Sequence, residues 1–153
     1  MGLLSGTHLK VGDPAPDFTL QDQAGRKIRL AGLKGKRVIL YFYPKADTPG
    51  CTKEACAFRD EASRFPGDVV ILGVSKDSIA SEKKFSDKFR LTFPLLSDEK
   101  GEVIKLYGVD FLFGFAKRVT FLIDRQGSIA KVFEKVDPDG HVDEVREALK
   151  KVS

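Results

Sequence analysis

Two largely apolar runs, Val38–Tyr43 and Val69–Ser75, dominate the hydrophobic pattern of the first half of the chain. Neither run shows a regular alternation with polar residues, which is typical of strands that are covered on both faces of a sheet. Between them, Thr52–Phe65 carries apolar residues at helical spacing, and Gly67 and Asp68 follow it as a break. The pattern predicts a strand–helix–strand unit whose strands run parallel and are joined by a right-handed crossover.

The second half of the chain continues this succession of elements and ends in an antiparallel hairpin and a helix. Two strand-like runs surround a turn that contains Gly127, which is the pattern of a hairpin. In the last helix Val142, Val145 and Leu149 share one face and are expected to point inward. The expected elements are, in order, a helix capped by Asp77 or Ser78 and running through Lys88, a short strand at Phe93–Ser97, a short helix at Lys100–Tyr107, strands at Val119–Asp124 and Ile129–Glu134, and a helix at His141–Lys151.

The N-terminal region has a different pattern, since Pro14 and Pro16 exclude a helix there. These prolines favour a loop that runs into an edge strand around Phe18–Leu20. Asp22–Gly25 supplies a turn, and Lys27–Leu30 returns as the partner strand of a β-hairpin. Together, the elements predict an α/β three-layer sandwich with a mixed central sheet flanked by helices and an N-terminal β-hairpin. Because the chain shows no repeat, low-complexity tract or linker, residues 1–153 are expected to form a single domain.

Composition and charge argue against several classes of protein. The 26 Lys and Arg residues against 22 Asp and Glu give a net charge of +4, and they are scattered, so nucleic-acid binding is not expected. No apolar run approaches the ~20 residues of a membrane helix, so no membrane partner is expected. The chain start lacks the features of a secretory signal, and a cytoplasmic location is the default expectation. In such a reducing compartment, two cysteines are expected to be catalytic or redox-active.

Both cysteines lie where the first apolar run passes into the first helix, after a loop that contains Pro44, Pro49 and Gly50. A thiol at the start of a helix lies beside free backbone N–H groups and the positive end of the helix dipole, which favour the thiolate. Strand, tight loop and cysteine at a helix start form an arrangement suited to thiol chemistry. The alternative for Cys51 is a buried structural cysteine, since cysteine is among the most frequently buried residue types.

The same segment carries the motif Pro44-x-x-x-Thr48-x-x-Cys51, and with it the chain resembles the peroxiredoxins. The run Gly50-Cys51-Thr52-Lys53-Glu54-Ala55-Cys56, followed by Phe58-Arg59-Asp60, resembles the bacterioferritin-comigratory (Q-type) subfamily in particular. Further agreement lies at Ala15–Phe18, at Lys36–Tyr43 and at Arg118–Asp124. The resemblance therefore covers nearly the whole chain, from about residue 9 to about residue 150.

This resemblance implies a thioredoxin-like fold and the reduction of hydrogen peroxide and alkyl hydroperoxides by a thiol. Cys51 would be the peroxidatic cysteine and Cys56 the resolving one, and thioredoxin or a glutaredoxin-like reductant would regenerate them. No cofactor is expected; a monomer is expected, with a dimer as the alternative. The alternative function is a peroxide sensor or redox relay that acts through a partner protein. A thioredoxin-type oxidoreductase is disfavoured because the two cysteines are not spaced as Cys-x-x-Cys.

The resemblance also implies roles for four further residues, each of which has a plainer structural interpretation. Thr48 would hydrogen-bond the peroxide and Pro44 would shield the thiolate, although both residue types also suit turns. Arg118 would lie beside Cys51, where a permanent charge and several donors can meet thiolate and peroxide together. The alternative for Arg118 is a solvated strand end. Glu54 would orient Arg118, or would only complement the helix dipole.

The spacing of Cys51 and Cys56 permits a geometric argument about the resolving step. Five residues along a regular helix give a rise of about 7.5 Å and Cα atoms about 8.5 Å apart, whereas a disulfide needs Cα atoms within roughly 7 Å. The two cysteines therefore cannot bond while the helix is regular, and at least its first turn must unwind. The alternative for Cys56 is a small core residue.

Two other features bear on metals and on substrate preference. His8 and His141 are expected at the surface, without the Cys or His companions of a metal site, so no metal is expected. Phe111–Phe115 contains three phenylalanines shortly before Arg118, where the family's loop is often longer and more polar. Core packing or a strand start is one interpretation of this segment. An apolar wall of the peroxide pocket and a dimer contact are the others.

Overall fold

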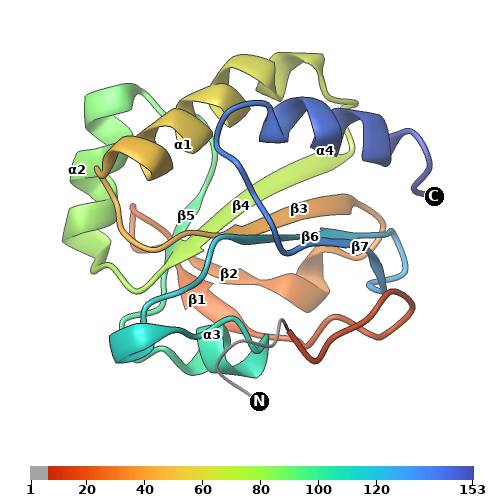
Figure 1. The fold of residues 1–153 in the computed structure, drawn as a ribbon, viewed down its shortest axis with the longest axis horizontal. Helices are drawn as coiled ribbons and strands as arrows, with labels where there is room; N and C mark the ends of the chain where they lie inside the picture. The colour runs from red at the N-terminus through yellow and green to blue at the C-terminus, as the bar shows by residue number, and fades with distance from the viewer. Residues whose placement is uncertain (1–6) are drawn as a thin grey trace.

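One mixed sheet of seven strands forms the middle of the molecule, and helices cover both of its faces (Figure 1). The computed structural model describes residues 7–153, so the expectation about a secretory signal concerns residues outside the described part. The strands are β1 (Thr19–Gln21), β2 (Lys27–Arg29), β3 (Arg37–Phe42), β4 (Val69–Ser75), β5 (Leu95–Ser97), β6 (Val119–Ile123) and β7 (Ile129–Phe133). The helices are α1 (Pro49–Glu61), α2 (Ile79–Phe89), α3 (Glu102–Leu106) and α4 (His141–Leu149), with short 3-10 helices at Leu30–Leu33, Ala62–Arg64 and Leu112–Gly114.

Strand β3 is an inner strand of the sheet, whose strand order is β2-β1-β5-β4-β3-β6-β7. It runs parallel to β4 on one side and antiparallel to β6 on the other. Every residue of β3 is buried, as expected for a strand covered on both faces. The predicted strand–helix–strand unit, the final antiparallel hairpin of β6 and β7, and the mixed three-layer architecture are therefore confirmed.

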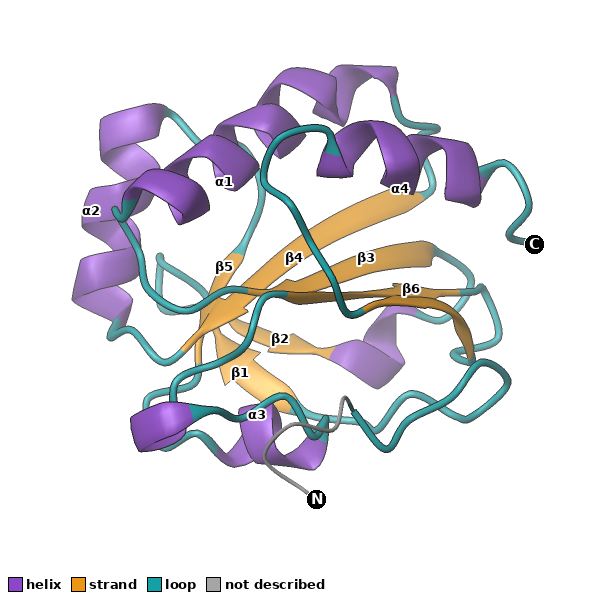
Figure 2. Cartoon of the chain, viewed as in Figure 1, coloured by secondary structure: helices purple, strands orange, loops and turns teal. Residues whose placement is uncertain are grey.

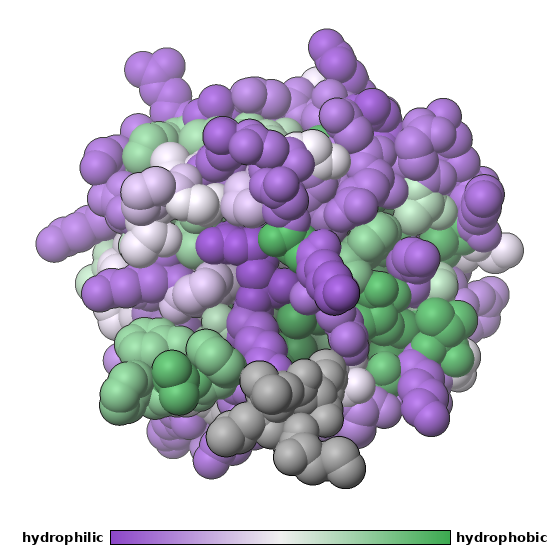
Figure 3. Space-filling view, in the orientation of Figure 1, coloured by the Kyte–Doolittle hydropathy of each residue, from purple (hydrophilic) through white to green (hydrophobic). Residues whose placement is uncertain are grey.

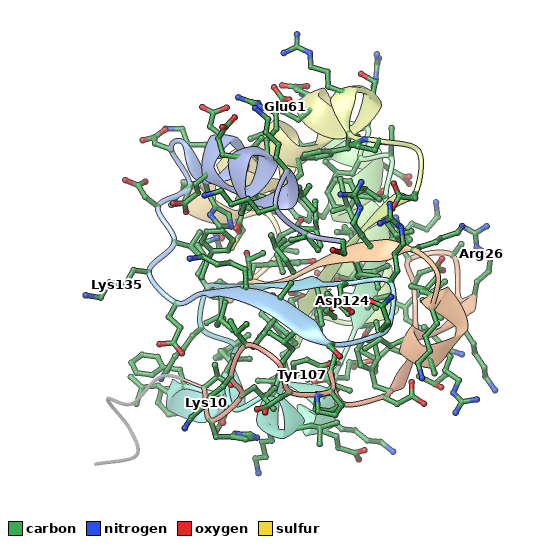
Figure 4. All side chains as sticks on the ribbon, turned by 90° about the vertical axis from the view of Figure 1, so that its right-hand side faces the viewer. Lys10, Arg26, Glu61, Tyr107, Asp124 and Lys135 are labelled. Atoms are coloured by element: carbon green, nitrogen blue, oxygen red, sulfur yellow. The ribbon has the colours of Figure 1, made fainter. Side chains whose placement is uncertain are left out.

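The sheet separates two hydrophobic cores, because successive side chains of a strand point to opposite faces. From β3, Ile39 and Tyr41 enter the core beneath α1, α2 and α4, whereas Leu40 and Phe42 enter the core on the α3 side. Figure 2 shows α1 and α4 along one face of the sheet and α3 below the other. In the side view of Figure 4, Tyr107 lies on the α3 side, where its hydroxyl donates a 2.6 Å hydrogen bond to the carbonyl of Pro16.

The N-terminal hairpin of β1 and β2 is confirmed, but its place in the sheet differs from the prediction. β1 is not an edge strand: it pairs with β2 on one side and with β5 on the other, through Gln21 opposite Ser97. The side chain of Gln23 adds a 2.7 Å hydrogen bond from Leu95 N. Both prolines precede the strand, so neither interrupts its hydrogen bonds, and the edge position passes to β2.

Helix α1 begins three residues earlier than the pattern suggested, at Pro49 instead of Thr52, and ends at Glu61 before a 3-10 turn. Proline is tolerated in the first turn of a helix because its missing N–H would have had no partner there. The earlier start places Cys51 inside the first turn of α1, and α1 also contains Cys56. The expected cap of α2 is confirmed at Ser78, whose side chain accepts a hydrogen bond from Ser81 N, and the helix ends at Phe89. Helix α3 is shorter than expected and covers only Glu102–Leu106.

The expectation of a surface position is wrong for His141 and right for His8. His141 is 1% exposed and its ring meets those of Phe58 and Phe133 edge to face. Its Nε2 lies 2.8 Å from Thr120 Oγ1 and its Nδ1 lies 2.6 Å from Glu144 Oε1. Helical geometry explains the burial, since His141 shares a face with the residues four and eight positions later, Val145 and Leu149.

Phe121 tests the core on the α3 side of the sheet. It is fully buried, with ring centroids 5.2 Å from Tyr107 and 5.9 Å from Phe42. Phe121→Ala should lower the free energy of unfolding by about 3–5 kcal/mol, because it removes buried contacts and leaves a cavity. Urea denaturation monitored by circular dichroism measures this. Phe113→Ala, at a side chain that is 87% exposed, is the matched control and should stay within about 0.5 kcal/mol of wild type. Equal effects would contradict the placement of Phe121.

Candidate active site

Cys51 is buried in the first turn of α1, directly beyond the loop that leaves the carboxyl end of β3. Thr48 occupies the N-cap position, but its side chain makes no capping hydrogen bond to the N–H groups of this turn. The first N–H groups of a helix have no partner within the helix, so they offer donors and partial positive charge to an anion. The fold therefore places a thiol at a helix end that stabilises negative charge.

Arg118 reaches this thiol from the neighbouring strand. It immediately precedes β6, and the antiparallel register pairs Val119 with Phe42 at the end of β3. This register brings residue 118 level with the start of α1. Arg118 Nη2 lies 3.4 Å from Cys51 Sγ, and Arg118 Nη1 donates a 2.8 Å hydrogen bond to Glu54 Oε1. One guanidinium thus contacts both the thiol and a carboxylate, residues that lie 67 and 64 positions away in the chain.

Glu54 follows Cys51 by one helical turn, on the same face of α1, and is buried. Burial raises the pKa of Glu54 to about 7, although the charge and hydrogen bond of Arg118 act in the opposite direction. Burial also opposes the charge of Arg118, but the neighbouring Cys51 and Glu54 outweigh it and raise the pKa of Arg118 above its ordinary value. The three groups form a buried, charge-coupled cluster.

Gly50 is a part of the site that the sequence interpretation had not assigned a role. A Cβ atom at this position would lie 3.1 Å from Arg118 Nη2 and 3.6 Å from a carbon of Pro138. The absence of a side chain lets the guanidinium lie against the first turn of α1, next to Cys51. The signal available in the sequence was a glycine directly before a candidate nucleophile, where it is easily taken for a turn residue only.

Thr48 and Pro44 occupy the loop between β3 and α1, one at each end. The Thr48 hydroxyl donates a 2.8 Å hydrogen bond to the carbonyl of Lys45, so its oxygen lone pairs can still accept. Pro44 and Arg118 both line a cavity beside the loop. All the predicted site residues except Cys56 thus gather around the start of α1. Cys56 is half-buried further along the same helix, and both cysteines are free.

We call the cavity that Pro44 and Arg118 line the aromatic cavity. It is apolar and has a volume of 590 Å³. The remaining side chains that line it come mostly from the segment Phe111–Phe115, with Lys45, Ala116 and Lys117. The interpretation of this segment as core packing is wrong, because its large apolar side chains are 39–87% exposed: Phe111, Leu112, Phe113 and Phe115. Figure 3 shows them as a green patch at the lower left, where Figure 1 places the loop before β6. An apolar surface thus adjoins Arg118 and Pro44.

The loop has one further support that the sequence interpretation missed. Asp77, after the carboxyl end of β4, accepts a 2.8 Å hydrogen bond from Ala46 N through its Oδ2. Since β3 and β4 are parallel, their carboxyl ends meet at the same edge of the sheet. The signal available in the sequence was Asp77, a polar residue shortly after the second buried strand.

Comparison with known proteins gives the family. The sequence pattern of the AhpC/TSA family matches residues 11–132, most of the chain, and the chain belongs to this family. A "Putative peroxiredoxin bcp" of Coxiella burnetii is 51% identical over 145 residues, 90% of this chain and 96% of that protein. "Peroxiredoxin Q, chloroplastic" of Sedum lineare is 44% identical over 142 residues, 90% of this chain and 76% of that protein. Within the family, the chain is therefore a peroxiredoxin of the bacterioferritin-comigratory, or Q-type, branch.

A solved structure agrees with this placement. The Xanthomonas campestris bacterioferritin comigratory protein superposes with a TM-score of 0.85 at 33% identity, and covers 95% of this chain and 98% of its own. Alkyl peroxide reduction activity is described for that protein. The thioredoxin-like fold is confirmed, and the chain is a thiol-dependent peroxidase. Within residues 7–153, no group of three or more His, Cys, Asp and Glu residues is placed to hold a metal ion, and no helix is long and apolar enough to cross a membrane.

Glu54→Gln tests the buried cluster through the pH dependence of stability. Below about pH 4.5 the carboxyl of Glu54 is protonated in both folded and unfolded chains; its folded pKa of about 7 means that the unfolded chain loses the proton first as the pH rises. The stability contributed by the protonated carboxyl is therefore lost as the pH rises through about 7. The free energy of unfolding of wild type, minus that of Glu54→Gln, should fall by on the order of 2 kcal/mol between about pH 4.5 and 7.5.

Urea titrations at several pH values measure this difference. Glu99→Gln, which removes an exposed carboxylate, is the control and should show a smaller change with pH. A pH-independent difference between Glu54→Gln and wild type would contradict the buried, proton-binding state of Glu54.

Proposed function

We propose that Cys51 is the peroxidatic nucleophile and that Arg118, Glu54, Thr48 and Pro44 form its active site. The observation that carries this proposal is the guanidinium of Arg118, 3.4 Å from Cys51 Sγ and paired at 2.8 Å with Glu54. A thiolate beside a permanent cation at a helix N-terminus is stabilised as the nucleophile. The same cation has further N–H donors for an incoming peroxide.

In the first step the Cys51 thiolate attacks one oxygen of the peroxide. The S–O bond forms as the O–O bond breaks, so the sulfur is oxidised to a sulfenic acid and the leaving oxygen takes a proton to become water or an alcohol. Arg118 stabilises the charge that moves onto the leaving oxygen. Thr48 accepts a hydrogen bond from the peroxide hydroxyl, for which its lone pairs are oriented by its own bond to Lys45. Pro44 shields the thiolate from water.

In the second step Cys56 resolves the sulfenic acid. Its sulfur attacks the sulfur of Cys51, a disulfide forms and the sulfenic oxygen leaves as water. Because α1 is a continuous helix over both cysteines, the first turns must unwind before the sulfurs can meet. Unwinding breaks the Glu54–Arg118 pair and the 2.6 Å ion pair of Lys53 with Asp139. Oxidation favours it, since a neutral sulfenic acid interacts with the Arg118 guanidinium more weakly than a thiolate does.

A dithiol reductant of the thioredoxin or glutaredoxin type then reduces the disulfide and returns both thiols. We extend the substrates to alkyl hydroperoxides as well as hydrogen peroxide, because the aromatic cavity gives an organic substituent an apolar surface beside Arg118. The alkyl peroxide reduction described for the Xanthomonas campestris relative supports this extension. We further propose a single domain over residues 1–153 that acts as a monomer in the cytoplasm.

Cysteine variants separate the two steps. Cys51→Ser should abolish thioredoxin-dependent consumption of hydrogen peroxide, because it removes the nucleophile. Cys56→Ser should still react once with one equivalent of peroxide, and intact-mass analysis should show a sulfenic acid or further oxidation of Cys51. Sustained turnover of Cys56→Ser with thioredoxin would contradict the resolving role, and unchanged activity of Cys51→Ser would contradict the central proposal. Failure of wild type to turn over with a general dithiol would favour a redox relay instead.

Phe111→Ser tests the contribution of the aromatic cavity to substrate choice. The loss of apolar contact should lower kcat/KM for cumene hydroperoxide by about 3–10-fold, equivalent to about 1 kcal/mol of binding. The value for hydrogen peroxide should stay unchanged, because that substrate has no apolar substituent. Leu106→Ser, at an apolar residue that is 44% exposed and lies outside the cavity, is the matched control. Equal losses for both peroxides would contradict a role in substrate discrimination.

A further inference from the structure

A buried carboxyl group, Glu82 of α2, has no place in the proposed mechanism and yet is connected to the active-site loop. It is fully buried, and its Oε1 accepts a 2.6 Å hydrogen bond from the hydroxyl of Tyr43, the residue before Pro44. Its Oε2 lies 3.3 Å from Ser75 Oγ. A charged carboxyl group buried at this depth costs free energy, so its hydrogen-bond partners indicate whether it is protonated.

From Ser75 the contacts continue to the loop itself. The Ser75 hydroxyl donates a 2.6 Å hydrogen bond to Asp77 Oδ2, and the same oxygen of Asp77 accepts from Ala46 N at 2.8 Å. Ala46 lies in the middle of the loop between β3 and α1 and is 8% exposed. Asp77 thus joins the loop to the carboxyl end of β4, at a point between Pro44 and Thr48.

The loop needs such an anchor because part of its backbone is strained. Asp47, directly after Ala46, has a φ of 58°, in the left-handed region that L residues avoid. Asp47 also makes an ion pair with Lys88 of α2, in which both side chains are about half exposed. An exposed ion pair of this kind contributes little to stability. The Ala46–Asp77 bond is buried more deeply and fixes the backbone directly.

Counting protons assigns the donors in this network. A serine hydroxyl has one proton, and Ser75 places it on the shorter contact, to Asp77. The contact of Ser75 Oγ with Glu82 then requires a proton from Glu82, which the carboxyl supplies when it is neutral. With that proton in place, Tyr43, Glu82, Ser75 and Asp77 form an unbroken chain of donors and acceptors that ends at Ala46 N. Every hydrogen-bonding group in the chain is satisfied, which stabilises a buried network.

We propose that Glu82, Ser75 and Asp77 are positioning residues that hold the loop before Cys51 in the geometry needed for its reaction with peroxide. Glu82 acts in its neutral form. When it loses its proton, it no longer donates to Ser75 and places a second negative charge near Asp77, so the anchor of Ala46 weakens. The loop carries Pro44 and Thr48, and a displaced loop lowers the rate at which Cys51 is oxidised. The inference rests on the proposed role of Cys51.

The environment of Glu82 indicates that its carboxyl group loses its proton in mildly alkaline solution. Burial raises the pKa of Glu82 to about 8 and the charge of Asp77 adds to this, whereas the hydrogen bond from Tyr43 acts in the opposite direction. The ionisable groups that face it are Tyr41 from β3, Tyr43 directly after β3, and Asp77 from the loop after β4. Burial raises the pKa of both tyrosines well above its ordinary value, so they stay neutral over the range in which Glu82 titrates.

Glu82→Gln is the decisive variant, because an amide can accept from Tyr43 and donate to Ser75 without losing a proton. The experiment uses a Cys56→Ser background, in which Cys51 is the sole thiol. Hydrogen peroxide is mixed with the protein between about pH 6 and 9.5, samples are quenched in acid, and intact mass gives the rate constant for Cys51 oxidation. Both chains should react alike near pH 6.5. Above about pH 8 the background chain should become slower than Glu82→Gln, by about 3–10-fold at pH 9.5.

Ser75→Ala and Asp77→Ala interrupt the network and should slow Cys51 oxidation about tenfold at pH 7. Asp87→Asn, on the exposed side of α2, is the matched control and should react like the background chain. A pH-independent ratio between Glu82→Gln and the background would overturn the proposal, even if the variants have altered melting temperatures. Rates within twofold of the background for both Ser75→Ala and Asp77→Ala would also overturn it. Absence of any reaction of the background chain with peroxide would instead refute the role of Cys51.

Discussion

The candidate active site depends on the contacts of the Arg118 guanidinium with Cys51 and Glu54. The guanidinium lies between two acidic groups, the thiol of Cys51 and the buried carboxyl of Glu54, and offers both of them a positive charge and hydrogen-bond donors. Several features of the fold serve this contact. The antiparallel register of β3 and β6 brings residue 118 to the start of α1, and a glycine in the first turn leaves room for the guanidinium. Sheet register and helix start thus cooperate to put one cation beside a thiol.

Much of the fold and site could be predicted from local patterns. The apolar run Val38–Tyr43 lacks alternation because β3 supplies both cores, and the position of Gly127 correctly gave the last hairpin. The residues from Pro44 to Glu54 lie close together in the chain, so the motif itself keeps them close in space. Arg118 was reached by resemblance, since no local pattern connects a residue at the start of a strand with a cysteine 67 positions earlier.

The parts that escaped prediction depend on contacts between distant elements. Whether β1 is an edge strand is decided by its pairing with β5, about which the prolines before β1 give no information. The position of His141 at a helix start suggested the surface, whereas its spacing to Val145 and Leu149 indicates the buried face. The contributions of Gly50 and Asp77 appear only when β6 and β4 are placed beside the loop. Except for His141, the missing information was a neighbour in space.

The alternation of side chains along β3 has a consequence for how the protein passes through its redox cycle. Among residues 7–153, the core beneath α1, α2 and α4 and the core on the α3 side share no residue, and the sheet lies between them. The proposed unwinding of α1 therefore opens one compartment and leaves the other closed. In the proposed cycle, the core on the α3 side keeps its packing while the half that carries the cysteines changes. Local unfolding on one side of the sheet can then recur without exposing the core on the other side.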